Sequence, residues 1–241
     1  MKLFVVGLGP GGIDQISKKA MKVLQESEII IGYIVYVDLI RDALKGKTFY
    51  STPMTQEIER CRAAIELASK GKKVSVVCSG DAGVYGMAGL IYELVQDYDN
   101  VEVEVVSGIT AACSGAAVLG APLTHDFAVI SLSDLLTPWD LIETRLECAS
   151  KADFVICLYN PSSRKRHDYL QKACDIVLKH RSPKTVCGYV QNIDRESESA
   201  VILTLQQLRD TNVNMYTTVY IGNSQTKEIQ GKMVTPRGYS I

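Results

Sequence analysis

Four loops rich in small residues constrain the fold of this chain most, because each follows an apolar run that is typical of a β-strand. The loops span residues 7–12, 79–86, 107–112 and 159–163. Loops without bulky side chains let the backbone N–H and C=O groups at a strand end approach a ligand closely. Because several such loops occur in one chain, we expect them to line a single composite cleft.

The first half of the chain alternates between apolar strands and amphipathic helices. Thr55 is the predicted N-cap of the second helix. An alternation of this kind predicts an α/β fold, with a mainly parallel sheet and helices on both of its faces. The predicted strands are 2–7, 28–31, 73–78 and 101–105, and the predicted helices are 14–26, 56–70, 84–96 and 109–119.

The second half has more strands and fewer helices, which predicts a mixed sheet with antiparallel pairing. One helix is expected to start with Thr137 as its N-cap and Pro138 at its first position, and another is expected over 164–179. Gly120-Ala121-Pro122 is the predicted hinge between a domain of residues 1–120 and a domain of residues 121–241. The predicted strands are 127–132, 152–158, 185–191, 200–205, 217–221 and 229–235.

Composition and charge argue against several classes of protein. The chain has 26 basic and 27 acidic residues, and this balance argues against broad nucleic-acid binding. No apolar run approaches the roughly 20 residues of a membrane-spanning helix, and residues 1–6 read as a strand instead of a secretory signal. The seven cysteines are scattered without a CxxC pair. We therefore expect reduced thiols in a cytoplasmic protein without a metal site, spatial convergence of ligands being the alternative.

The first loop, Gly7–Gly12, fits the GxGxxG pattern of dinucleotide-binding folds. Two features weaken that interpretation. Gly32-Tyr33 stands where an acidic residue would hold the ribose, and Pro10 lacks the N–H that a pyrophosphate would accept from. A tight turn without a ligand, or a different ligand in the same crevice, are the other interpretations.

The second and third loops carry more specific chemistry. Asp81 lies between glycines at a strand end, where it can accept from a ribose diol or a cationic amine, or merely cap a helix. Ser107–Ala112 offers N–H groups and the Thr110 hydroxyl at a helix start, which suits a carboxylate or an amide. The alternative for this segment is a tightly packed helix of small residues.

Two further groups lie in the second half. One predicted strand is flanked by His125-Asp126 and by the segment Ser131–Asp134. Such side chains can act as acids and bases in catalysis near neutral pH, and the alternative is a purely structural role. Arg164-Lys165-Arg166 places cations at a helix start, where they oppose the helix dipole unless an acidic ligand offsets them. Arg195 is a weaker candidate of the same kind.

Together the loops resemble the tetrapyrrole (corrin/porphyrin) methyltransferase family over essentially the whole chain, through GLGPGG at residue 7, GDAGVYG at residue 80 and SGITAA at residue 107. The second half is similar to the precorrin-3B C(17)-methyltransferase branch of cobalamin biosynthesis in residues 121–139, 158–166 and 188–193. Asp194 departs from that branch, which often has Gly there.

The resemblance implies two α/β domains with S-adenosylmethionine bound in the cleft between them, and a homodimer. It implies methyl transfer to C17 of precorrin-3B or cobalt-precorrin-3, with contraction of the tetrapyrrole ring. The alternatives are a related methylase acting at another corrin carbon or on uroporphyrinogen, an NAD-binding oxidoreductase, or a binding module without catalysis. The expected partner is then a tetrapyrrole small-molecule substrate. Binding to nucleic acid or to a membrane is not expected.

The resemblance also implies roles for particular residues. His125, Asp126, Ser131 and Asp134 are the candidates for the proton transfers of ring contraction, or for orienting the substrate. The expected substrate contacts are Gly9, Gly11, Ser133, Arg164, Lys165 and Arg166. The expected donor contacts are Pro10, Ser79, Gly80, Asp81, Val84, Tyr85, Thr110, Ala111, Leu158, Tyr159, Ile193, Ile221, Gly222 and Asn223.

Overall fold

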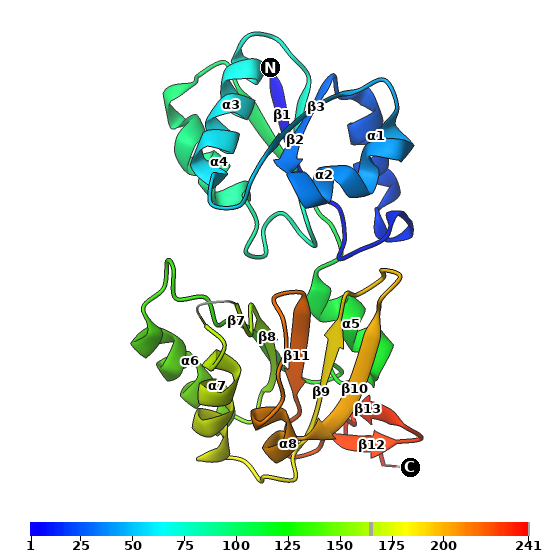
Figure 1. The fold of residues 1–241 in the computed structure, drawn as a ribbon, viewed down its shortest axis with the longest axis vertical. Helices are drawn as coiled ribbons and strands as arrows, with labels where there is room; N and C mark the ends of the chain where they lie inside the picture. Colours follow the sequence, from blue (N-terminus) through cyan, green and yellow to red (C-terminus); the bar gives the residue numbers. More distant parts are fainter. Residues whose placement is uncertain (164–165, 241) are drawn as a thin grey trace. The chain divides into compact units, whose positions relative to one another are not determined.

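A computed structural model of the chain describes residues 1–163 and 166–240 (Figure 1). The chain forms two compact units, Met1–Ala111 and Ala112–Ile241. The domain boundary predicted between residues 120 and 121 stays a prediction. Among the described residues, no helix has the length and apolar character needed to cross a membrane.

The first unit is built on a five-stranded sheet in the order β3-β2-β4-β1-β5, and all of these neighbours are parallel. Its strands are β1 (Lys2–Gly7), β2 (Ile29–Tyr33), β3 (Thr48–Thr52), β4 (Val74–Cys78) and β5 (Glu102–Val106). Its helices are α1 (Lys18–Glu26), α2 (Ile34–Arg41), α3 (Glu57–Ser69) and α4 (Ala88–Leu94), with short 3₁₀ turns at Ile13–Gln15, Asp42–Leu44 and Val95–Asp97.

Apolar side chains on both faces of this sheet explain its helical cover. Strand β1 sends Leu3 and Val5 into a core with α3 and α4, whereas its Val6 joins a second core with α1 and α2. Every residue of β4 is buried, as expected for a parallel strand covered on both sides. The predicted parallel sheet with helices on both faces is therefore confirmed, and the two helical layers are visible in Figure 1.

Several predicted helix starts in this unit are wrong by a few residues. Helix α1 begins at Lys18 instead of residue 14, because the Ser17 hydroxyl caps it by accepting from the Ala20 N–H (3.1 Å). Thr55 does not cap α3, since its φ is +72° and the helix begins at Glu57. The helix predicted from residue 84 begins at Ala88, and α2 and β3 were not predicted.

The second unit contains a five-stranded sheet in the order β10-β9-β11-β8-β7. Only β7 and β8 are parallel among these pairs, so the predicted mixed sheet is confirmed. Its strands are β7 (Phe127–Ser131), β8 (Val155–Tyr159), β9 (Val186–Gln191), β10 (Ser199–Thr204) and β11 (Thr217–Ile221). Its helices are α5 (Ala111–Leu119), α6 (Trp139–Lys151), α7 (Tyr169–Leu178) and α8 (Leu205–Arg209).

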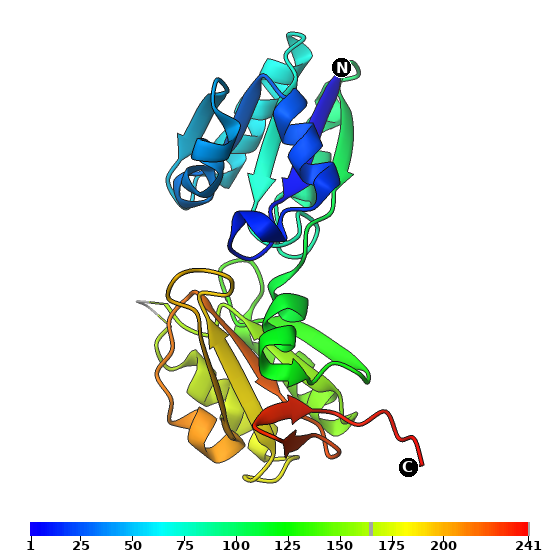
Figure 2. The ribbon, with the colours of Figure 1, turned by 90° about the vertical axis from the view of Figure 1, so that its right-hand side faces the viewer.

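A smaller sheet in this unit replaces the single strand predicted over 229–235. It joins β12 (Lys227–Ile229), β13 (Lys232–Val234) and β6 (Gly120–Ala121) (Figure 2). Gln230 and Gly231 connect the first two strands with φ values of +50° and +71°, the conformation of a two-residue hairpin turn. Helix α6 likewise begins one residue later than predicted, with Pro138 in extended conformation as its N-cap residue.

Candidate functional site

Three of the four predicted loops meet at one edge of the first unit's sheet. They follow β1, β4 and β5, which are neighbours and parallel, so their carboxyl ends share one edge. The loops after β1 and β4 are bonded directly, because the Gly9 N–H donates to the Gly80 carbonyl (3.0 Å) and the Gly80 N–H donates to the Gly9 carbonyl (2.7 Å). In a dinucleotide fold the second glycine lets the pyrophosphate approach the backbone, and here the backbone polar groups of Gly9 are already paired with Gly80, which counts against the NAD interpretation.

Glycine is required where these loops touch. A Cβ on Gly108 would lie 2.2 Å from the Gly80 carbonyl oxygen, and a Cβ on Gly7 would lie 2.6 Å from the Gly108 nitrogen. The side-chain space at both positions is thus filled by backbone of a neighbouring loop. Gly9 and Gly80 have φ values of +81° and +64°, which other residues adopt only with strain. The main effect of these glycines is to let the backbones of the three loops pack closely against one another at this edge of the sheet.

Asp81 ties the second loop to the third. Its Oδ1 accepts from the Gly83 N–H (2.8 Å) within its own loop, and its Oδ2 accepts from the Gly108 N–H (2.9 Å). A carboxylate offers about four lone-pair sites, so it can still accept from a ligand. The roles expected for Asp81 were a ligand contact or a helix cap, and this link between loops was not predicted.

All donor contacts predicted in the first unit lie on these three loops. Tyr85 is 58% exposed, with a φ of +53°. Pro10 is buried, and Ser79 and Asp81 are half-buried. The structure brings together on this edge Gly9, Pro10, Gly11, Ser79, Gly80, Asp81, Val84, Tyr85, Thr110 and Ala111.

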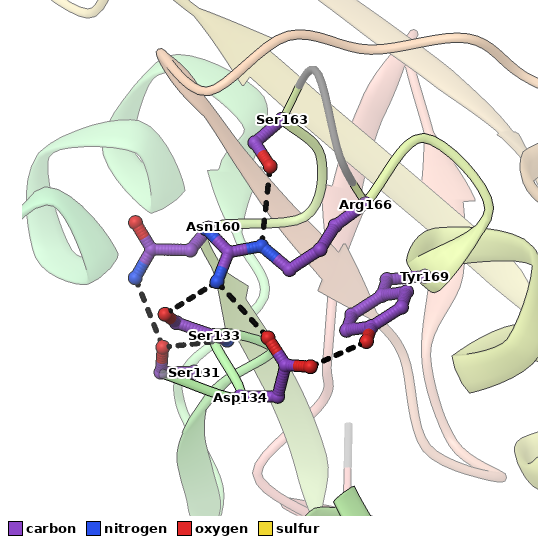
Figure 3. A network of polar contacts seen from close by, with 7 residues as sticks. All are labelled: Ser131, Ser133, Asp134, Asn160, Ser163, Arg166 and Tyr169. Atoms are coloured by element: carbon purple, nitrogen blue, oxygen red, sulfur yellow. Dashed lines mark hydrogen bonds and ion pairs between the residues drawn. The ribbon is translucent and has the colours of Figure 1, made fainter. Parts of the chain in front are cut away.

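In the second unit, Arg166 is the centre of a polar network at the carboxyl ends of β7 and β8 (Figure 3). Its Nε donates to Ser163 Oγ (3.1 Å), and its Nη1 donates to Ser133 Oγ (2.8 Å) and to Asp134 Oδ1 (3.3 Å). The Arg166 side chain is only 15% exposed. Arg164 and Lys165, predicted alongside it, lie outside the described residues.

Asp134 has a partner on each of its carboxylate oxygens. Besides the contact with Arg166, its Oδ2 accepts from the Tyr169 hydroxyl (2.6 Å). The hydrogen bond from Tyr169, reinforced by Arg166, lowers the pKa of Asp134 below its ordinary value. The same bond to Asp134 raises the pKa of Tyr169. Near neutral pH the pair is therefore a carboxylate and a neutral phenol.

Ser131 completes the network from the end of β7. Its Oγ accepts from the Asn160 side-chain amide (2.9 Å) and from the Ser133 N–H (3.2 Å). Asn160 has a φ of +53°, which turns the chain sharply after β8. Asn160 and Ser163 belong to the fourth predicted loop but were given no role of their own, and Tyr169 was not predicted at all. The available signal was the Asn-Pro turn after a buried strand, with Tyr169 three residues beyond Arg166.

His125 and Asp126 lie at the opposite end of β7 from Ser131 and Asp134. His125 Nδ1 accepts from the Asp126 N–H (3.0 Å), and its distance to the Asp126 carboxylate is 3.8 Å. Both side chains are exposed. The structure thus brings together two of the four predicted acid–base residues and places the other two one strand length away.

The remaining predicted donor contacts fall on two ends of the second sheet. Tyr159 and Ile193 lie at the end that carries Asn160, and the Tyr159 hydroxyl accepts from the Ala112 N–H (2.6 Å). Leu158 is fully buried in the core. Because β11 runs antiparallel to β8, the turn Ile221–Asn223 lies at the other end.

The predicted tight packing of the small-residue helix is confirmed in α5. A Cβ on Gly115 would lie 2.4 Å from the Tyr220 hydroxyl oxygen and 3.0 Å from Ile193. The Tyr220 hydroxyl donates to the Ala112 carbonyl (2.9 Å). Ala112 is therefore bonded to two tyrosines, to Tyr159 through its N–H and to Tyr220 through its carbonyl. Among the described residues, no group of three or more His, Cys, Asp or Glu side chains is placed to hold a metal ion.

Asp194, the departure from the resembling branch, occupies a left-handed position with a φ of +56°. Glycine adopts this conformation freely, and Asp and Asn are the side chains that tolerate it best. Its N–H donates to Glu198 Oε2 (2.7 Å), a contact that any non-proline residue can keep. Aspartate in place of glycine at position 194 is therefore compatible with the same backbone conformation of the turn.

We expect Asp194→Gly to change the free energy of unfolding by less than about 0.5 kcal/mol, whereas Asp194→Val should cost about 1–2 kcal/mol because a β-branched residue is strained at positive φ. Denaturant unfolding of both variants checks this. Equal losses for Gly and Val would show that the Asp194 side chain, and not its backbone conformation, matters.

Comparison with known proteins places the chain in a family. The profile of the tetrapyrrole (corrin/porphyrin) methylases matches residues 2–209. The chain is 47% identical over 243 residues to the cobalt-factor III methyltransferase of Priestia megaterium, covering 99% of this chain but only 45% of that relative. It is 46% identical to the probable cobalt-factor III C(17)-methyltransferase of Salmonella typhimurium, covering 99% and 100% of the two chains.

A solved structure gives the same result for the fold. The crystal structure of the methyltransferase CobJ has a TM-score of 0.90 and 32% identity, over 97% of this chain and 99% of that one. The expected two-domain α/β architecture of the family is thereby confirmed as the fold class. The chain belongs to the tetrapyrrole (corrin/porphyrin) methylase family.

Proposed function

We propose that this chain is an S-adenosylmethionine-dependent methyltransferase that methylates C17 of cobalt-factor III or cobalt-precorrin-3 in cobalamin biosynthesis, with contraction of the ring. The observation that carries the proposal is the 46% identity, over the full length of both chains, to a relative named for C17 methylation of cobalt-factor III. The names of the two relatives favour the cobalt-containing substrate over metal-free precorrin-3B.

The loop edge of the first unit fits the methyl donor. S-adenosylmethionine carries a cationic amine and ribose hydroxyls that need acceptors, and a carboxylate and an adenine that need donors. Asp81 and the glycine-rich backbone supply acceptors, and the third loop at the start of α5 brings further polar groups, the Thr110 hydroxyl among them, to the same edge. When bound, the donor supplies a methyl group on a positively charged sulfur. The residues of this edge need only bind it, orient it and exclude water.

The network of the second unit fits an acidic acceptor. Tetrapyrroles of this pathway carry many carboxylates, and Arg166 is a cation held at the carboxyl ends of two neighbouring strands. Ser131, Ser133 and Asp134 lie at this edge, whereas His125 and Asp126 do not. We therefore propose this edge, with Arg164 and Lys165 beside it in sequence, for substrate binding.

Calorimetric titration with S-adenosylhomocysteine tests the donor part of the proposal. We expect saturable binding to one site that an excess of NAD does not displace. Displacement by NAD would favour a dinucleotide-binding protein, and absence of binding to the purified chain would contradict the methyltransferase assignment.

The proposal extends to assembly and location. We propose a cytoplasmic homodimer, and large apolar side chains on the first unit such as Ile34, Met54 and Ile58, which are 47%, 43% and 55% exposed, are candidates for the contact. Light scattering during size-exclusion chromatography should give twice the 26.5 kDa mass of the chain. A monomeric mass at micromolar concentration would contradict the dimer.

A further inference from the structure

We propose that Asp134 and Tyr169 are positioning residues that fix the Arg166 guanidinium so that its Nη2 edge meets a carboxylate of the tetrapyrrole, and that Asp134 does not transfer protons in the reaction. The inference rests on the proposed function, since it names how that substrate is recognised. It also assigns roles to Tyr169 and Ser163, which the sequence did not indicate.

The guanidinium is held on two of its three nitrogens. Nε is engaged by Ser163, and Nη1 is shared between Ser133 and Asp134. Within residues 1–163 and 166–240, no hydrogen bond engages Nη2. Because the group is planar, these three contacts fix its plane and therefore the directions of the Nη2 donors. An arginine fixed in this way loses little entropy when it binds an anion.

The backbone beneath Arg166 is fixed as well. The Arg166 N–H donates to the Ser163 carbonyl (3.1 Å), and the Ser163 N–H donates back to the Arg166 carbonyl (3.4 Å). The side chain of Ser163 then accepts from Nε of the same arginine (3.1 Å). Ser163 therefore holds Arg166 at both its main chain and its head group.

Both carboxylate oxygens of Asp134 accept hydrogen bonds within this network. One of its oxygens accepts from Arg166 and the other from Tyr169, so the carboxylate bridges the two side chains (Figure 3). Its lowered pKa keeps it ionised near neutral pH, and the raised pKa of Tyr169 keeps the phenol protonated. A carboxylate that is more acidic than usual is a poor base and is not an acid at neutral pH. The protonation states of Asp134 and Tyr169 therefore suit orientation of the Arg166 side chain and not proton transfer to or from the substrate.

Tyr169 is itself immobilised by packing. Its ring lies 4.5 Å from the Trp139 ring, centroid to centroid, at an interplanar angle of 52°. The Lys172 ammonium lies 4.9 Å from the centroid of the Tyr169 ring. Trp139 belongs to α6 and Tyr169 to α7, so two helices fix the direction of the hydroxyl that holds Asp134.

The substrate class follows from the charges. Arg166 and Asp134 form a close ion pair with little net charge, so the site does not attract every anion strongly. It instead offers the N–H donors of Nη2 in fixed directions, one of which suits a carboxylate oxygen. A tetrapyrrole with acetate and propionate arms presents such groups at its rim.

Steady-state kinetics with the tetrapyrrole and S-adenosylmethionine test the inference. For Asp134→Asn and Tyr169→Phe, we expect the KM for the tetrapyrrole to rise by about 5- to 20-fold, because a charge-assisted contact that orients Arg166 is lost. The kcat and the KM for the donor should stay within about twofold of wild type. Arg166→Lys should raise the tetrapyrrole KM at least as much, since lysine cannot be held by the same planar fork.

Asp99→Asn and Tyr239→Phe are matched controls on exposed residues and should leave both constants unchanged. Calorimetric binding of S-adenosylhomocysteine and the thermal midpoint show that each variant is folded. A kcat for Asp134→Asn reduced 100-fold at unchanged KM would overturn the inference and make Asp134 a proton-transfer group. Wild-type KM values in all three variants would overturn it too. Wild-type protein that neither binds nor methylates the tetrapyrrole would instead refute the proposed function, and the inference with it.

Discussion

Asp81→Ala is expected to weaken binding of S-adenosylhomocysteine by about 100-fold, because the ligand loses a charged acceptor worth roughly 1.5–3 kcal/mol and the loops lose the carboxylate that joins them. The carboxylate holds Gly83 within the second loop and Gly108 in the third, at 2.8 and 2.9 Å. Without it, the second and third loops lose the side-chain contact that joins them, and the ligand loses an acceptor. Isothermal titration calorimetry measures the dissociation constant directly.

Asp81→Asn separates the two roles of the side chain. Asparagine keeps one carbonyl acceptor, so we expect an affinity between those of the wild type and the alanine variant. Asp99→Asn, an exposed acidic residue in the same unit, is the control and should bind as the wild type does. Unchanged affinity of Asp81→Ala would remove Asp81 from the donor site and leave it a role in the loop structure alone.

Gly108→Ala is expected to destabilise the protein by about 3 kcal/mol, near the upper range for overpacking. The added Cβ would lie 2.2 Å from the Gly80 carbonyl oxygen and 2.6 Å from the Gly7 carbonyl carbon. Both obstacles are backbone atoms of other loops, so no side chain can rotate away. At 2–4 °C per kcal/mol for a chain of this size, the thermal midpoint should fall by about 10 °C.

Gly89→Ala is the matched control for that experiment. Gly89 lies in α4 of the same unit, and a Cβ there would meet no heavy atom within 4 Å. Alanine should raise stability by about 0.5–1 kcal/mol, because it restricts the unfolded chain and favours the helix. Similar midpoints for the two variants would mean that the loops can separate freely, contrary to the close contact described above.

The fold could be predicted from sequence because its signals are local. Buried strands such as β4, and the small residues that follow them, are visible in a single sequence. The helix starts were less predictable, since both Ser17 and Thr55 are acceptable N-caps and only Ser17 is used. Strand direction in the second sheet was also hidden, because the residue pattern of β11 is the same for parallel and antiparallel pairing. The position of the Ile221–Asn223 turn could therefore not be foreseen.

The candidate site was predictable in part for similar reasons. Parallel neighbours bring their carboxyl ends together, so the loops after β1, β4 and β5 could be grouped from sequence. His125 and Ser131 could have been separated from sequence, because His125 precedes the five-residue strand that ends at Ser131. The link from Asp81 to Gly108 and the contact of Tyr169 with Asp134 depend on tertiary geometry that a single sequence does not contain.

The central claim is methyl transfer to C17, and one measurement tests it most directly. The purified chain would be incubated without oxygen, under single-turnover conditions, with methyl-labelled S-adenosylmethionine and cobalt-factor III or cobalt-precorrin-3. Mass spectrometry would count the transferred methyl groups, and NMR would locate the label. The account predicts one labelled methyl group at C17 of a contracted ring. Label at another ring carbon, or no transfer while the donor remains bound, would contradict it.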